Sequence, residues 1–177
     1  MINKKIAFIG SVGSGKTTLI QNLSNTETIN TDVKSSVDIG KDMTTVGMDY
    51  GEIKIDDQFK LGLYGVPGQR KFSFMWDFVK EGLWAVVILI KNNSTQSINE
   101  LDYLLDYFAV NEKMPCLIGI THSDKIKGDT SKKHIKAILN KRGLNLPIYS
   151  INANLKDNAD LIFRTLILLE ETNNGSF

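Results

Sequence analysis

One octapeptide limits the possible folds of this chain more than any other part of its 177 residues. It reads Gly10-Ser11-Val12-Gly13-Ser14-Gly15-Lys16-Thr17 and matches the pattern G-x-x-x-x-G-K-[ST]. An apolar run at 4–9 precedes it and a helix-like segment at 16–24 follows, which is the strand, loop and helix context that the pattern requires. The glycines let consecutive backbone N–H groups turn inward around an anion, and the helix N-terminus adds its positive end. The sequence therefore predicts a nucleotide phosphate-binding loop.

Two side chains of this loop are expected to carry the chemistry. Lys16 is expected to neutralise the β- and γ-phosphate oxygens, and the hydroxyl of Thr17 to ligate Mg²⁺. The candidate phosphate-binding residues are the following: Gly10, Val12, Gly13, Ser14, Gly15, Lys16, Thr17 and Thr18.

Strand-like runs alternate with helical ones along the chain, which predicts a mostly parallel sheet with helices on both faces. The expected strands are 4–9, 53–55, 59–64, 85–90, 117–120 and 147–150, and the expected helices are 16–24, 72–82, 98–111, 131–141 and 157–171. Residues 56–58 form a short turn between two strands, so one edge strand should run antiparallel. We therefore predict a three-layer α/β/α fold with a six-stranded sheet. Residues 25–47 show little periodicity, which is typical of a functional or mobile loop.

The length and charge of the chain fit one domain, expected at 1–172 with a disordered tail at 173–177. Its 21 basic and 20 acidic residues create no field that would attract nucleic acid or an anionic membrane. No span, lipidation motif or disulfide framework is encoded, and the single Cys116 lies in an apolar run, as a buried thiol would. These features predict a cytoplasmic protein without a membrane anchor.

The base of the nucleotide should be bound where later strands end. Thr121-His122-Ser123-Asp124 follows the strand at 117–120, and a carboxylate at Asp124 can accept hydrogen bonds from guanine N1–H and its exocyclic amine. Adenine offers no matching donor pair. Ile151-Asn152-Ala153-Asn154 follows the last strand, where a backbone N–H beside a small residue can approach guanine O6. The candidate guanine-binding residues are Thr121, His122, Asp124, Asn152 and Ala153, although an Asp after a strand is also a common helix cap.

From residue 4 to about 171 the chain resembles the Ras-like small GTPases. The resemblance rests on the phosphate loop, on both tetrapeptides above, and on Thr44-Thr45-Val46-Gly47 and Val66-Pro67-Gly68-Gln69. Within that superfamily it is most similar to the bacterial branch of gliding-motility (MglA-type) GTPases, several of which work with roadblock-type partners. The resemblance implies GTP, GDP and Mg²⁺ as ligands, and two switch segments, 25–47 and 65–82, that contact regulators and effectors.

The resemblance also implies catalytic roles for Lys16, Thr45 and Gln69. Thr45 would ligate Mg²⁺ when the γ-phosphate is present, with Thr44 as the alternative. Gln69 would orient the attacking water, and the N–H of Gly68 would contact the γ-phosphate.

The chain departs from the family pattern at three positions. Gly65 stands where relatives carry the aspartate of the outer Mg²⁺ shell; Asp49 either reaches the same region or is an ordinary exposed charge. His122 replaces a lysine and must supply the flat surface under the base. Val12 places a β-branched side chain beside the γ-phosphate, which should slow hydrolysis.

In the helix after Gln69, a helical repeat of apolar residues predicts the face that packs on the sheet: Phe72, Met75, Trp76 and Val79. Phe74 and Phe78 then point elsewhere. They either dock a partner or pack against the helix expected at 98–111.

These features predict a molecular switch with slow GTP hydrolysis that is regulated by partner proteins. No arginine precedes Arg70, so the first switch cannot supply an arginine to the phosphates. A GTP-binding structural protein without hydrolysis is the alternative. A small-molecule kinase fits less well, because such kinases use several arginines and this chain has them only at 70, 142 and 164.

Overall fold

The central sheet contains both parallel and antiparallel strands. A computed structural model describes residues 2–33, 46–56, 59–123 and 130–173. In these ranges one sheet has the strand order β2-β3-β4-β1-β5-β6-β7. The strands are β1 (Ile2–Gly10), β2 (Ile29–Val33), β3 (Val46–Lys54), β4 (Phe59–Pro67), β5 (Leu83–Lys91), β6 (Cys116–Thr121) and β7 (Ile148–Ile151).

The fold class predicted from the sequence is confirmed, with one strand more than expected. Strands β4, β1, β5, β6 and β7 run parallel to one another, and β3 runs antiparallel to β4, as the hairpin predicts. The additional strand, β2, lies within the stretch expected to be irregular and pairs antiparallel with β3, so the antiparallel strand is not at the edge. It was not predicted from the sequence because this strand is only five residues long and lies in a stretch rich in polar residues.

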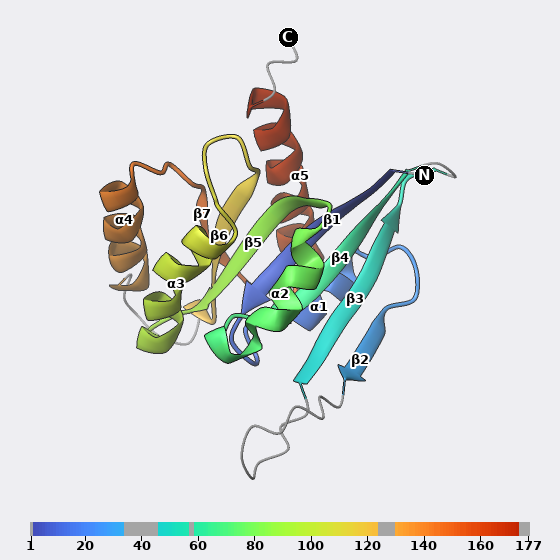
Figure 1. Cartoon of the computed structure of the whole chain (residues 1–177), viewed down its shortest axis with the longest axis horizontal. Coiled ribbons are helices and arrows are strands. Elements are labelled where there is room, and N and C mark those ends of the chain that lie inside the picture. Colours follow the sequence, from blue (N-terminus) through green and yellow to red (C-terminus); the bar gives the residue numbers. More distant parts are fainter. Residues whose placement is uncertain (1, 34–45, 57–58, 124–129, 174–177) are drawn as a thin grey trace.

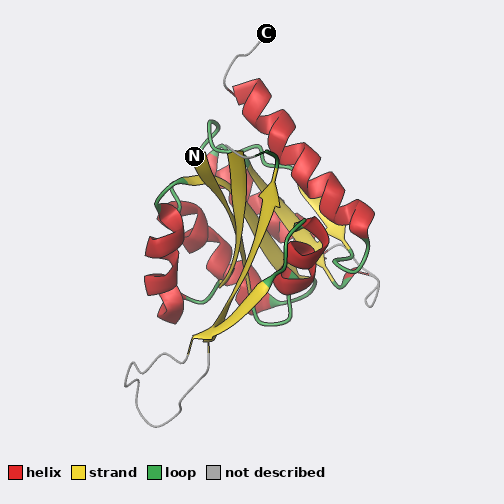
Figure 2. Ribbon diagram, turned by 90° about the vertical axis from the view of Figure 1, so that its right-hand side faces the viewer, coloured by secondary structure: helices red, strands yellow, loops and turns green. Residues whose placement is uncertain are grey.

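Five helices in the described part of the chain cover the two faces of the sheet (Figures 1 and 2). They are α1 (Lys16–Leu23), α2 (Ser73–Lys80), α3 (Thr95–Tyr107), α4 (Thr130–Arg142) and α5 (Lys156–Asn173), and a 3-10 turn (Arg70–Phe72) leads into α2. Helices α2, α3 and α4 pack on one face, and α1 and α5 pack on the other. None of the described helices is long and apolar enough to cross a membrane.

Strand β1 shows why the sheet is buried on both sides. Its residues alternate between the two cores: Ala7 and Ile9 face α2 and α3, whereas Ile6 and Phe8 face α1 and α5. All four are fully buried, so the strand must be apolar without interruption. This central strand ends at Gly10, where the phosphate loop begins.

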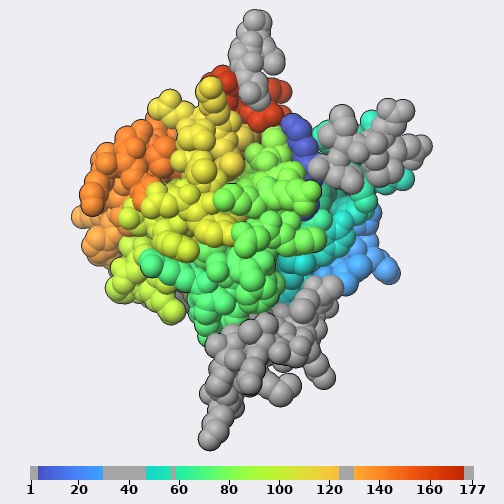
Figure 3. Space-filling model, viewed as in Figure 1, coloured from blue at the N-terminus to red at the C-terminus, as the bar shows by residue number. Residues whose placement is uncertain are grey.

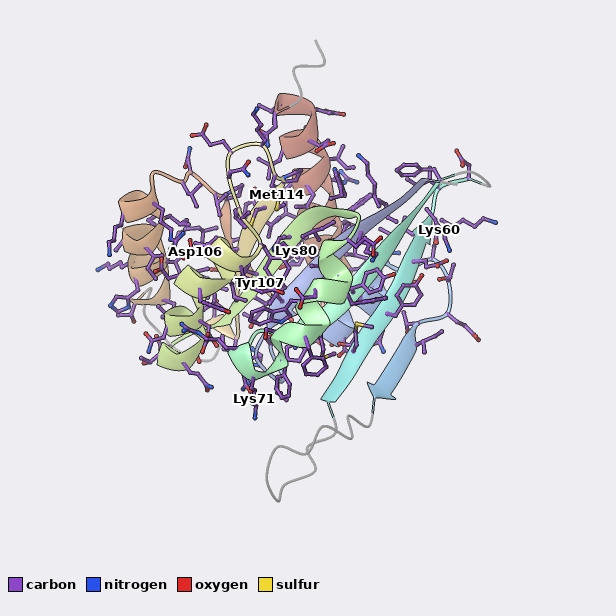
Figure 4. All side chains as sticks on the ribbon, in the orientation of Figure 1. Lys60, Lys71, Lys80, Asp106, Tyr107 and Met114 are labelled. Carbon is purple, nitrogen blue, oxygen red and sulfur yellow. The ribbon has the colours of Figure 1, made fainter. Side chains whose placement is uncertain are left out.

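Helix α2 packs on the sheet through the face that the sequence predicts. Phe72, Met75, Trp76 and Val79 are all buried. The indole N–H of Trp76 donates to the carbonyl of Pro67 at 2.7 Å, and its ring lies edge-on to Tyr107 of α3 at 4.9 Å. The ammonium of Lys80 lies 4.8 Å from the centre of the Tyr107 ring (Figure 4). These contacts attach α2 to both β4 and α3.

The other face of α2 leaves two phenylalanines exposed. Phe74 is 48% exposed and Phe78 is 56% exposed. Phe78 lies edge-on to Tyr64 of β4 at 5.9 Å, so its ring contacts the sheet. In the space-filling view, the green surface of α2 lies between the teal strand β3 and the yellow-green helix α3 (Figure 3).

Candidate nucleotide-binding site

The phosphate loop lies where the parallel strands reach their carboxyl ends. Gly10, at the end of β1, is paired with Pro67 of β4 and Leu89 of β5. At the same edge, Thr121 of β6 pairs with Lys91 and with Ile151 of β7. Ligands of open α/β sheets bind at this edge, so the topology brings the phosphate loop together with the described ends of β6 and β7.

The phosphate loop turns at Gly15, which has a left-handed backbone conformation and leaves no room for a side chain. Gly15 has φ 95°, and a Cβ atom built there would lie 2.8 Å from the Cβ of Ala153. The loop also closes on itself, since the N–H of Ser14 donates to the carbonyl of Ser11 at 3.1 Å. Glycine at position 15 therefore lets the phosphate loop approach the segment after β7.

A cavity of about 300 Å³ lies between the loop and the ends of β6 and β7. It is lined by Gly13, Ser14, Gly15, Lys16, Thr17, Thr18, Thr121, His122, Ile151, Asn152, Ala153 and Asn154. All but Ile151 and Asn154 are residues that the sequence analysis selects as candidate site residues. The volume is at the lower end of the range for small-molecule sites, about 300–1,000 Å³.

Lys16 carries a partly buried positive charge beside this cavity. Its ammonium donates to the carbonyls of Gly10 at 3.1 Å and Ser11 at 3.0 Å. Burial lowers the pKa of Lys16 to about 8; the charge of Asp49 raises it in part, and the positive charge of Lys91 lowers it further. A bound phosphate group would place a negative charge next to this ammonium and stabilise its charged form.

Thr17 and Asp49 form an oxygen-rich corner next to Lys16. The hydroxyl of Thr17 donates to Oδ2 of Asp49 at 2.8 Å, and Asp49 is buried. Among the described residues, no group of three or more His, Cys, Asp or Glu side chains is placed to hold a metal. Mg²⁺ does not need one, because one or two protein oxygens, substrate phosphates and water commonly complete its shell. The donor set at Thr17 and Asp49 therefore fits Mg²⁺.

The base-side wall of the cavity is held by side-chain hydrogen bonds. His122 has a left-handed backbone, with φ 61°, and its Nδ1 lies 3.2 Å from the hydroxyl of Thr121. Asn22 of α1 donates its amide to the carbonyl of Ala153 at 2.9 Å. The N–H of Asn152 donates to the side chain of Asn158 at 3.0 Å. Helices α1 and α5 thus both support the segment after β7.

Several candidate residues lie away from the main cavity. Gly10, Gly68 and Gln69 line a second cavity of about 20 Å³ against α3, and the N–H of Gly68 donates to the carbonyl of Gly10 at 3.0 Å. Val12 is 75% exposed. Arg70 points to α3, where its Nε lies 2.9 Å from a carboxylate oxygen of Glu100.

Two predicted residues, Thr45 and Asp124, lie outside the described residues, as does the alternative Thr44. The structure also draws attention to residues that the sequence analysis does not select as site residues. Asn22 supports the base-side wall, and Lys91 contacts the phosphate loop from the end of β5. The sequence shows that Lys91 follows a buried strand, which could have marked it as a site residue. Its contact with Val12, however, depends on which strands are neighbours in the sheet.

The fold and this cavity define a phosphate-loop nucleotide-binding protein of the α/β class. Comparison with known families goes further: the sequence model of the ADP-ribosylation factor family matches residues 2–162. The chain belongs to this family of small GTPases. Family membership implies binding of GTP and GDP.

The chain is also similar to individual proteins in sequence or in fold. The chain is 33% identical over 129 residues to the uncharacterized protein MJ1339 of Methanocaldococcus jannaschii, covering 72% of this chain and 75% of that protein. The fold is similar to the Arl6 BBS3 small GTPase of Trypanosoma brucei, solved with the nucleotide analogue GppNp, with a TM-score of 0.68 and 16% identity over 97% of this chain and 99% of that one. It is also similar to the bacterial selenocysteine-specific elongation factor EF-Sec, with a TM-score of 0.65 and 20% identity; the match covers 97% of this chain and 29% of that chain.

Proposed function

We propose that this protein is a guanine-nucleotide switch that binds GTP or GDP with Mg²⁺ and hydrolyses GTP slowly. The proposal rests on one observation: the phosphate loop and the segments after β6 and β7 line the same cavity. Residues 1–172 would form its one GTPase domain, which agrees with the family match over 2–162.

Phosphate binding is assigned to the loop and to Lys16. Gly13 to Thr18 line one end of the cavity, and the N-terminus of α1, at Lys16, lies within this stretch and favours negative charge there. The partly buried ammonium of Lys16 would move from the two loop carbonyls to the phosphate oxygens. Guanine would lie at the other end, between His122 and the backbone of Asn152 and Ala153, with Asp124 as the residue that distinguishes guanine from adenine.

Thr17 and Thr45 are assigned to Mg²⁺ directly, and Asp49 to its outer shell. The contact between the Thr17 hydroxyl and the Asp49 carboxylate supports this assignment. When bound, Mg²⁺ would neutralise phosphate charge. The protein residues orient the surrounding oxygens and restrict solvent.

Slow hydrolysis follows from the residues near the phosphate loop. Gln69 is the only catalytic group proposed to orient water, whereas Arg70 is held by Glu100 and by the ring of Tyr103, 4.2 Å away. Val12 narrows the approach to the γ-phosphate. An external arginine or another cation from a partner would therefore accelerate the reaction.

Regulators and effectors are proposed to bind at the switch segments, 25–47 and 65–82. The exposed Phe74 and Phe78 of α2 support this proposal because two aromatic side chains on one helix face make an effective contact site. We place the protein near the MglA-type branch, with roadblock-type partners and a cytoplasmic location. A GTP-binding structural protein that has lost hydrolysis remains the second candidate, favoured by Val12 and by glycine at position 65.

The nucleotide carried by the purified protein tests this proposal. We expect denaturation to release close to one equivalent of GDP or GTP, identified by anion-exchange chromatography. Exchange to radiolabelled GTP, followed over hours, then separates a slow hydrolase from a structural protein, in which GTP would persist. Release of adenine nucleotides would contradict the proposal.

A further inference from the structure

We infer that Lys91 is a positioning residue of the phosphate loop, which orients the peptide between Val12 and Gly13 for the β-phosphate of a bound nucleotide. This inference rests on the proposed function. It adds a role that neither the loop motif nor the base-binding motif includes.

The contact that carries the inference joins two segments distant in sequence. The ammonium of Lys91, at the end of β5, donates to the carbonyl of Val12 at 2.9 Å. A Cβ atom built on Gly13 would lie 3.3 Å from the same ammonium. Lys91 therefore lies against the crest of the loop.

The contact of Lys91 with Val12 also fixes the direction of the N–H of Gly13. The carbonyl of Val12 and the N–H of Gly13 belong to one planar trans peptide, so they point in opposite directions. Lys91 holds the carbonyl on its own side and does not line the cavity, whereas Gly13 does. Within the described ranges, the N–H of Gly13 has no protein acceptor. It is therefore directed away from Lys91 and available to a phosphate oxygen.

The charge of Lys91 supports the same role. In the part of the chain that the structure describes, no carboxylate forms an ion pair with Lys91. A lysine that has no carboxylate partner among the described residues, placed beside a loop that begins a helix, favours the binding of an anion at that loop.

The position of Lys91 also relates to a departure noted in the sequence. Lys91 is the cross-strand partner of Thr121, the residue before His122. Relatives carry a lysine at the position of His122. This chain has a histidine there and carries a lysine at the end of the adjacent strand.

The test compares release of fluorescent GDP from wild-type protein and three variants, measured by stopped flow. Lys91→Met removes the charge and the donor, and we expect release at least about tenfold faster, since about 1.4 kcal/mol corresponds to tenfold. Lys91→Arg keeps both and should stay within about threefold of wild type. Lys113→Met removes one exposed lysine before β6, at the opposite edge of the sheet, and should leave the rate unchanged.

Affinity for GMP separates positioning from a general structural role. GMP lacks the β-phosphate, so Lys91→Met should weaken GDP binding and leave the weaker GMP binding unaltered. Equal losses for GDP and GMP, or a wild-type rate of GDP release in Lys91→Met, would overturn the inference. Failure of the wild-type protein itself to bind GDP would instead refute the proposed function.

Discussion

Asp49 and Gly65 face each other across the antiparallel strands β3 and β4, and the carboxylate of Asp49 occupies the space that a side chain at position 65 would need. The two residues are register partners, and a Cβ atom on Gly65 would lie 2.8 Å from Oδ2 of Asp49. The same oxygen accepts the hydroxyl of Thr17 at 2.8 Å. In the proposed site, Asp49 would therefore supply from the neighbouring strand the carboxylate that the family resemblance places at position 65.

The proposed exchange predicts a loss of Mg²⁺ dependence that a second substitution should restore. Asp49→Ala should weaken the Mg²⁺ dependence of GDP retention by about 10–100-fold, the usual cost of losing an outer-shell ligand, and barely change release in EDTA. Gly65→Asp alone should destabilise the protein, because the new side chain collides with Asp49. The double variant Asp49→Gly with Gly65→Asp should recover Mg²⁺ dependence. An unchanged Mg²⁺ dependence in Asp49→Ala would show that Asp49 has no part in the metal site.

Ser14 offers a test of stability in the phosphate loop. Its hydroxyl is buried and has no hydrogen-bond partner among the described residues. Leaving a buried polar group unsatisfied costs about 1–3 kcal/mol, so Ser14→Ala should raise the free energy of unfolding by about 1 kcal/mol in urea, without nucleotide. Ser97→Ala is the matched control: its buried hydroxyl lies 3.0 Å from that of Ser94, and removing it should lower stability. Loss of stability in Ser14→Ala would contradict this explanation.

Cys116 should be chemically inert in the folded protein. Burial raises the pKa of its thiol from 9.0 to about 12, so almost no thiolate exists at pH 8. We expect no labelling by a thiol reagent at pH 8 until denaturant is added. Because the unfolded chain ionises first, this residue's contribution to stability should be complete below pH 9 and decline as the pH rises toward 12. Rapid stoichiometric labelling of native protein would place Cys116 at the surface.

Hydrolysis should be slow because the first switch has no arginine to neutralise the negative charge of the transferred phosphoryl group. Without a partner, we expect single-turnover GTP hydrolysis on the order of 10⁻⁴ s⁻¹ or below. Val12→Gly should raise the rate modestly by freeing Gln69, whereas Gln69→Leu should nearly abolish it and keep nucleotide affinity. A rate of about 1 s⁻¹, or no effect of Gln69→Leu, would assign catalysis to another residue.

The parts of the fold that the sequence predicts are those with strong local signals. The strand, loop and helix around Gly10 to Thr17 are read from apolar runs and glycine spacing, and the buried face of α2 from helical periodicity. Strand β2 was not predicted, because Ile29–Val33 is only five residues long and such a short run carries a weak local signal.

Long-range contacts at the site were harder to predict. The approach of Asp49 to Thr17 depends on the antiparallel register between β3 and β4. The sequence alone therefore could not decide whether Asp49 reaches the metal region or is an ordinary exposed charge. The contact of Lys91 with Val12 needs β5 beside β1, and strand order is a property of the whole sheet.

The most direct test of the central claim is the preference of the protein for guanine. Competition against fluorescent GDP in Mg²⁺ should show that GDP binds far more tightly than ADP. Asp124→Asn should shift part of this preference to xanthosine diphosphate, because the amide reverses the donor and acceptor pattern presented to the base. Equal affinities of the wild-type protein for GDP and ADP would contradict the assignment as a guanine-nucleotide switch.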